Sequence, residues 1–192
     1  IRTALAMGAD QGIHICDPVA EGSDSLATAK LLAAALKDLP CDLIIAGHRA
    51  VDEDNYQVAA GVAEFMGIPQ ISMVNKAEVS EGKITCHRTI EGGTVVMEAA
   101  LPALFTTQRG LNEPRYASLP GIMKAKKKTV DVKTVADLGV DAGSVGAGNR
   151  KVKIKALNLP PERQAVRMIE AEGAADKAAE LVTILHEEIK VI

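Results

Sequence analysis

The stretch LIIAGHRAVDEDNYQVAAGVAEFM, residues 43–66, decides the fold because it joins a strand pattern to a helix pattern through a polar loop. Residues 43–47 form a continuous apolar run, which suits a parallel strand covered on both faces. Apolar residues then recur at helical spacing from Val58 to Met66, and Gly67 is typical of a residue that ends a helix. The stretch therefore predicts a strand, a loop and a helix, the repeating unit of α/β proteins.

The flanking segments repeat this alternation. Residues 12–16 predict a short strand, and apolar residues from Leu32 to Leu39 recur on one face of a predicted helix. Another apolar strand is predicted at residues 71–74. Strands and helices in such short succession predict a doubly wound α/β domain with a mostly parallel sheet.

The pattern changes from helical to alternating beyond this point. Residues 83–90 alternate in the manner of a strand, Gly92-Gly93 is a hairpin turn signal, and residues 94–97 can return as the partner strand. The predicted hairpin extends the edge of the sheet. Residues 101–106 add one more apolar strand.

Regular patterning weakens in the last third of the chain. A short helix is predicted at residues 121–126, a strand at residues 152–157, and an amphipathic helix at residues 174–190. We therefore expect an α/β domain at residues 1–140, followed by a linker and an extended C-terminal arm at residues 141–192.

The composition disfavours several functional classes. The net charge is −3 and aromatic residues make up 2% of the chain, so the stacking platforms of many single-strand nucleic-acid proteins are missing. No apolar run has the length of about 18 residues that a membrane helix needs, so we expect no membrane insertion.

Cys16, Cys41 and Cys86 are widely spaced without a CxxC pair. We expect three small core residues in a reducing compartment, and no zinc or dithiol site.

The polar loop between the predicted strand and helix is the first candidate site. Open α/β sheets bind ligands beyond the carboxyl ends of their strands, and a helix start attracts phosphate. Asp52, Glu53 and Asp54 would repel phosphate, but they can cap the helix or accept hydrogen bonds from a ribose or an adenine. A capped, solvated loop is the alternative, and a metal site is less favoured. The candidate nucleotide-binding residues are Gly47, His48, Arg49, Ala50, Val51, Asp52, Glu53, Asp54, Asn55, Tyr56, Gln57 and Val58.

No catalytic constellation is evident from residue spacing. The histidines are scattered, and the chain has neither a nucleophile elbow nor a Walker loop. The sequence therefore favours a binding or carrier module over a hydrolase, without catalytic or metal-ligating residues.

The second candidate site is LNEPRYASLPGIMKAKKK, residues 111–128. A loop that carries Leu119 beside a lysine cluster is a reasonable docking device, since one inserted leucine contributes roughly 1.5–3 kcal/mol. In the alternative interpretation Leu119 packs into its own core and the lysines are merely solvated.

The same segment closely resembles the signature of electron transfer flavoprotein β subunits. Residues 2–10, 47–58 and 137–141 and the Pro160-Pro161 segment resemble the same family, so that the resemblance covers essentially the whole chain. It implies an adenine nucleotide alpha hydrolase-like α/β fold. It also implies a heterodimer in which the C-terminal arm wraps an α subunit that carries FAD.

The resemblance further implies a function in electron transport. The FAD takes electrons from dehydrogenases, such as acyl-CoA dehydrogenases, and passes them to a quinone oxidoreductase or another acceptor. Leu119 matches the anchor of the dehydrogenase recognition loop, and Lys124 and Lys127 match lysines that are methylated in some members. The chain would work in the bacterial cytoplasm or, in a eukaryote, in the mitochondrial matrix.

Two departures from the family pattern affect the nucleotide site. Family members begin with a strand and an Asn-Pro-containing loop that contact the nucleotide, and we expect this N-terminal part to be missing from the chain. AMP-binding members have Asn and Thr at the positions of Tyr56 and Val58. Gln57-Val58 is closer to electron-bifurcating members, which hold a second FAD there, and it favours FAD over AMP. The alternative function is a stand-alone module that binds or hydrolyses adenine nucleotides.

Overall fold

A computed structural model describes residues 1–163 and 165–192 of the chain. It contains two compact units, residues 1–153 and residues 154–192. Residues 141–153, which are predicted to belong to the linker and the arm, are part of the first compact unit. The functional division at residue 140 stays a prediction.

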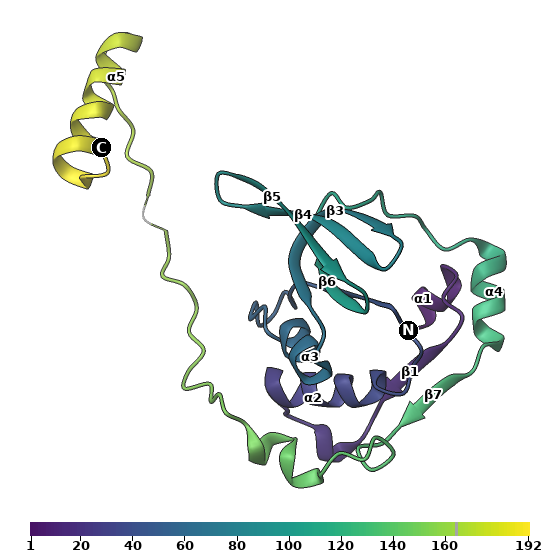
Figure 1. Cartoon of the computed structure of the whole chain (residues 1–192). Coiled ribbons are helices and arrows are strands. Elements are labelled where there is room, and N and C mark those ends of the chain that lie inside the picture. The colour runs from purple at the N-terminus through teal and green to yellow at the C-terminus, as the bar shows by residue number, and fades with distance from the viewer. Residues whose placement is uncertain (164) are drawn as a thin grey trace. The chain divides into compact units, whose positions relative to one another are not determined.

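The larger sheet of the first unit carries the strands predicted at residues 43–47, 71–74 and 101–106 and the predicted hairpin (Figure 1). Its strand order is β2-β6-β3-β4-β5, in which the pairs β2–β6 and β6–β3 are parallel and the pairs β3–β4 and β4–β5 are antiparallel. The tight turn at Gly92, with φ of 81°, joins β4 to β5 as the glycine pair predicts. The strands are β2 (Leu43–Gly47), β3 (Gln70–Ser80), β4 (Lys83–Ile90), β5 (Gly93–Ala100) and β6 (Ala103–Thr107).

A second sheet, with two strands, corrects the expectation of one continuous sheet. Strand β1 (Gly12–Ile15) pairs in parallel with β7 (Val130–Lys133), and Gly12 lies opposite Val130. Strand β7 lies in the stretch where the sequence has weak patterning. Within the described residues no strand connects β1 to β2, so the parallel part of the fold is divided into two sheets.

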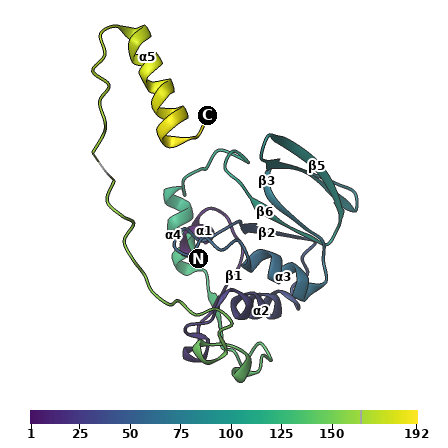
Figure 2. The ribbon, with the colours of Figure 1, turned by 90° about the vertical axis from the view of Figure 1, so that its left-hand side faces the viewer.

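Helices α2 (Ser25–Leu36) and α3 (Val58–Met66) pack side by side (Figures 1 and 2). Small side chains permit the close approach: a Cβ at Gly61 would lie 2.7 Å from the Cβ of Ala29. Helix α3 ends at Gly67 in the left-handed conformation, φ 66°, as predicted. The buried residues of this contact are Ala29, Ala33, Ala59, Val62, Ala63 and Leu104.

Further buried side chains complete the core of the large sheet. Cys86 is fully buried in it, as expected, whereas Cys16 is exposed and Cys41 is half-buried. The expectation of three core cysteines is therefore wrong for Cys16, which lies just beyond the end of β1, and Cys41 is not part of a core cluster either. This core cluster comprises Ile71, Val74, Ile84, Cys86, Ala103 and Phe105.

Helix α4 (Leu119–Lys127) starts two residues earlier than predicted and packs against α1 (Arg2–Ala6). The Ser118 hydroxyl caps α4 by accepting a hydrogen bond from the N–H of Gly121. Three short 3₁₀ helices, η1 (Pro18–Ala20), η2 (Ala142–Ser144) and η3 (Ala147–Asn149), complete the first unit.

In the described part of the second unit, a helix follows an irregular segment. Helix α5 (Ala174–Thr183) continues as the π-helix η4 (Ile184–Ile189), close to the predicted bounds. The strand predicted at residues 152–157 is wrong, because the segment carries no regular secondary structure. No helix in the described part of the chain is long and apolar enough to cross a membrane.

Candidate functional site

The predicted loop borders a cavity of about 340 Å³ beyond the carboxyl end of β2. Most of the candidate residues from Gly47 to Val58 line this cavity, and Val51, Asp54 and Tyr56 do not. The structure therefore brings most of the predicted set together at the edge of the sheet where α/β proteins bind ligands.

The opposite wall comes from the start of α2, where the sequence predicts only a helix cap. Ser23, Asp24, Ser25 and Thr28 line the cavity and supply hydroxyl and carboxylate groups. The signal for this wall is weak in the sequence, because a Ser-Asp-Ser run is also typical of an ordinary helix start.

Two helices begin at this cavity with different capping. The Asp24 carboxylate caps α2 by accepting a hydrogen bond of 3.0 Å from the N–H of Ala27. Helix α3 follows Gln57, whose side chain makes no capping hydrogen bond. Its first-turn N–H groups therefore remain suitable donors for an anion, which the helix dipole also favours.

His48 connects the carboxyl ends of two neighbouring strands. Its Nδ1 lies 2.8 Å from the carbonyl oxygen of Thr107, the last residue of β6. Because a carbonyl only accepts, Nδ1 carries a proton in this contact. The contact fixes the ring at the mouth of the cavity and leaves Nε2 as the second polar atom of His48.

Arg49 is held by two neighbours within its own loop. Its guanidinium forms an ion pair with Asp54 and lies 5.7 Å from the ring centroid of Tyr56, within the range of a cation–π contact. Asp54 and Tyr56 adopt φ of 54° and 57°, which non-glycine residues rarely do. Backbone strain of this kind is concentrated at functional sites. The ion pair and the ring contact show that Asp54 and Tyr56 hold the Arg49 guanidinium.

Asn55 joins the loop to the start of α2. Its Nδ2 donates hydrogen bonds to the Ser25 hydroxyl at 2.6 Å and to the Glu53 carboxylate at 2.7 Å. Asp52 and Glu53 also line the cavity. The site thus combines donors for an anion with acceptors for hydroxyl or amino groups.

No metal-binding cluster of His, Cys, Asp or Glu occurs among the described residues.

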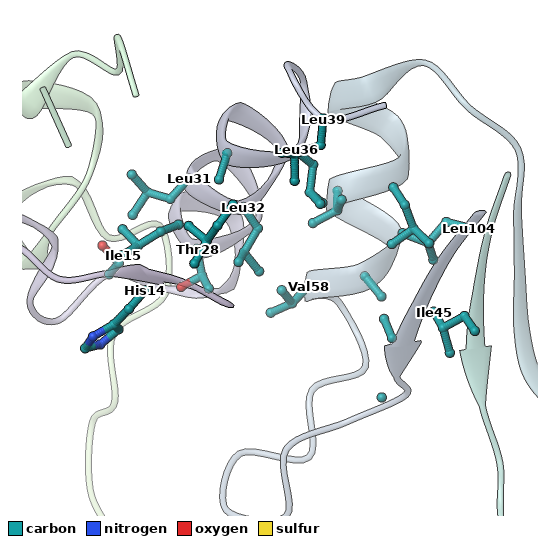
Figure 3. A pocket seen from close by; sticks show the side chains of 18 of the residues that line it. His14, Ile15, Thr28, Leu31, Leu32, Leu36, Leu39, Ile45, Val58 and Leu104 are labelled. Atoms are coloured by element: carbon teal, nitrogen blue, oxygen red, sulfur yellow. The ribbon is translucent and has the colours of Figure 1, made fainter. Parts of the chain in front are cut away.

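An apolar groove of about 730 Å³ lies next to the cavity and shares five lining residues with it: Ser23, Thr28, Gly47, Val58 and Ala59. Figure 3 shows Leu32 and Val58 between His14 of β1 and Ile45 of β2. Ile45 is 61% exposed although its strand has the pattern of a buried one.

The second candidate site is exposed. Leu119 begins α4 and is 74% exposed, so the interpretation in which it packs into its own core is wrong. Ile122 and Met123 are exposed too, and Lys124 and Lys127 lie in the last turn of the helix. Apolar and basic side chains therefore share one short helix, and the docking role of Leu119, Lys124 and Lys127 stays a prediction.

Comparisons with known proteins give a consistent result. The family model described as "Electron transfer flavoprotein domain" matches residues 1–138. An electron transfer flavoprotein subunit beta from Syntrophomonas wolfei is 43% identical over 182 residues, covering 94% of the chain and 68% of the relative. The proteins of the same name from Bacillus subtilis and Bos taurus are 41% and 40% identical. They cover 100% and 96% of the chain, which spans 74% and 70% of their own lengths.

The Asp24 carboxylate predicts a pH dependence of stability. Hydrogen bonds from the N–H groups of Ala27 and Lys151 lower the pKa of Asp24 below its ordinary value of 3.8. The resulting stabilisation is complete above the unfolded-state pKa and is lost as the pH falls through the folded-state value.

We expect urea unfolding to show a lower free energy of unfolding for Asp24→Asn than for the wild type at neutral pH. The difference should begin to shrink as the pH falls below about 4, the ordinary pKa of aspartate in an unfolded chain, and should disappear once the pH is below the lowered pKa of Asp24 in the folded protein. A constant difference at every pH would contradict this assignment.

Proposed function

The chain belongs to the electron transfer flavoprotein family, and we propose that it is the β subunit of a heterodimeric electron carrier. In this proposal the chain is not an enzyme by itself. It receives no substrate for chemical conversion, and its work is to hold a nucleotide and to present the assembly to redox partners.

The observation that carries the proposal is the cavity between the loop after β2 and the start of α2. Its volume of about 340 Å³ lies at the small end of the range for ligand pockets, roughly 300–1,000 Å³. We propose that it takes an adenosine 5′-phosphate group. This group is present in AMP and also in FAD, so both proposed ligands share the required chemistry.

The donors and acceptors of the cavity fit the parts of such a group. The first turn of α3 and the Ser25 hydroxyl offer hydrogen bonds to a phosphate, and Arg49 adds positive charge. Asp52 and Glu53 offer carboxylates to ribose hydroxyls or to the adenine amino group. The residues Gln57-Val58 favour the FAD alternative, as the family resemblance implies.

A further strand in the groove between β1 and β2 would complete the nucleotide domain. The family resemblance implies a strand beside the nucleotide, and the open edges of β1 and β2 border the same apolar groove. A parallel strand there would join both sheets and cover Ile45. Its connecting loop would then reach the nucleotide cavity, which shares residues with the groove.

We propose that the partner of the chain is an α subunit that holds the flavin through which electrons pass. The second compact unit supports this, because it exposes many apolar side chains that a partner can cover. These are Ile154, Leu157, Leu159, Val166, Met168, Leu181, Val182, Ile189, Val191 and Ile192. The donors would be dehydrogenases such as acyl-CoA dehydrogenases, and the acceptor a quinone oxidoreductase or another protein.

The free cysteines suit a reducing compartment, and we propose the bacterial cytoplasm as the site of action, or the mitochondrial matrix in a eukaryote.

Extraction of nucleotides from the purified heterodimer tests the proposed function. We expect either one FAD and one AMP, or two FAD molecules, for each heterodimer, measured by chromatography after denaturation. One FAD with AMP indicates a simple carrier, and two FAD molecules indicate a second flavin in this chain. A single FAD with no further nucleotide would contradict the proposed cavity.

Removal of the Leu119 side chain tests the docking site. We expect Leu119→Ala to weaken the interaction with the dehydrogenase about tenfold or more, because a buried leucine contributes roughly 1.5–3 kcal/mol. The measurement is the KM for the heterodimer in flavin reduction by its dehydrogenase. Val79→Ala is the matched control, since Val79 is 61% exposed but lies on β3. Equal KM values for both variants would show that Leu119 is not the anchor.

A further inference from the structure

Residues 144–151 close over the turn that precedes α2, and we call them the latch. The N–H of Gly146 donates to the Ser23 hydroxyl at 2.9 Å, and the N–H of Ala147 donates to the carbonyl of Glu21 at 3.0 Å. Both bonds join segments more than a hundred residues apart in the sequence. The latch is therefore attached at the backbone and not only by side-chain packing.

The Asp24 carboxylate is the third attachment and has two separate tasks. Oδ1 accepts from the N–H of Ala27 and caps α2, while Oδ2 accepts from the N–H of Lys151 at 2.6 Å. Val145 attaches the latch to the core, since it is 4% exposed and packs with Ala27 and Leu31 in a small core cluster.

The turn that receives the latch also forms a wall of the nucleotide cavity. Ser23, Asp24 and Ser25 line the cavity, and Ser25 accepts the hydrogen bond from Asn55 of the opposite loop. A ligand in the cavity and the latch therefore contact the same three-residue turn. The latch also ends two residues before Lys153, the last residue of the first compact unit, so it fixes where the chain leaves that unit.

We propose that Asp24 is a positioning residue that couples nucleotide binding to closure of the latch, and so to the starting point of the C-terminal arm. The inference rests on the proposed nucleotide function and adds a consequence to it. A ligand that orders the turn at residues 23–25 lowers the entropy cost of forming the hydrogen bonds between this turn and the latch. By linkage, a closed latch raises the affinity for the ligand by the same factor.

Asp24→Asn separates the two tasks of the carboxylate. Asparagine caps helices about as well as aspartate, so its oxygen can still accept from Ala27. Its NH₂ group then faces the N–H of Lys151, where two donors cannot form a hydrogen bond. The variant therefore loses the hydrogen bond to the N–H of Lys151 and retains the cap of α2 at Ala27.

Asp17→Asn is the matched control. The Asp17 carboxylate also divides its oxygens between two backbone groups, accepting from Val19 and from Val135, each at 2.9 Å. Asp17 does not line the nucleotide cavity. Its substitution therefore removes a bond of the same kind outside the nucleotide cavity and leaves the three hydrogen bonds of the latch in place, although Val135 packs in the same core cluster as Val145.

The test is hydrogen exchange of the latch amides in the heterodimer, with saturating AMP and after removal of the nucleotide, combined with calorimetric titration of AMP. In the wild type we expect AMP to slow exchange at Ala147 and Lys151 at least about fivefold, a typical lower limit for coupled sites. Asp24→Asn should lose this slowing and bind AMP more weakly by a similar factor. Asp17→Asn should keep both properties.

The possible failures are distinguishable. If AMP binds to the wild type and leaves exchange of the latch unchanged, the coupling is wrong and the nucleotide function stands. If AMP and FAD both fail to bind, the proposed function is wrong and the coupling falls with it. The wild-type measurement decides the coupling even if Asp24→Asn does not fold.

Discussion

The close packing of α2 against α3 is the contact on which the site depends. Gly61 and Ala29 allow the two helices to approach so closely that even one added Cβ would lie 2.7 Å from its neighbour. Both helices then begin at the same cavity, one capped by Asp24 and the other without a side-chain cap. A larger separation would leave the loop after β2 without its opposite wall, and Asn55 could not reach Ser25.

The electrostatic design of the cavity follows from this geometry. Helix dipoles and N–H groups favour an anion at the start of α3, although three acidic residues follow one another in the loop. Asp54 is directed to Arg49 and does not line the cavity, which leaves Asp52 and Glu53 as the loop carboxylates that do. The loop thus separates the acid that supports the positive charge from the acids that can accept hydrogen bonds from a sugar or a base.

Local patterns in the sequence predicted the elements that depend on neighbouring residues. The strand at Leu43–Gly47, the helix that ends at Gly67 and the hairpin turn at Gly92 all agree with the structure. The pairing of β1 with β7 was not predictable in the same way, because its two strands are far apart in sequence and β7 has only four residues. The α2 wall of the cavity was missed for the same reason, since Ser25 and Asn55 meet only in the folded chain. The exposure of Leu119 also required the structure, because an apolar residue next to lysines is compatible with both a core and a surface position.

The most direct test of the central claim is an experimental structure of the heterodimer with its bound nucleotides. The account predicts a phosphate oxygen within hydrogen-bond distance, about 2.7–3.2 Å, of the N–H groups in the first turn of α3. The sugar or the base should then face Asp52 and Glu53. A nucleotide bound elsewhere on the chain, with protein side chains filling the cavity between the loop after β2 and the start of α2, would contradict it.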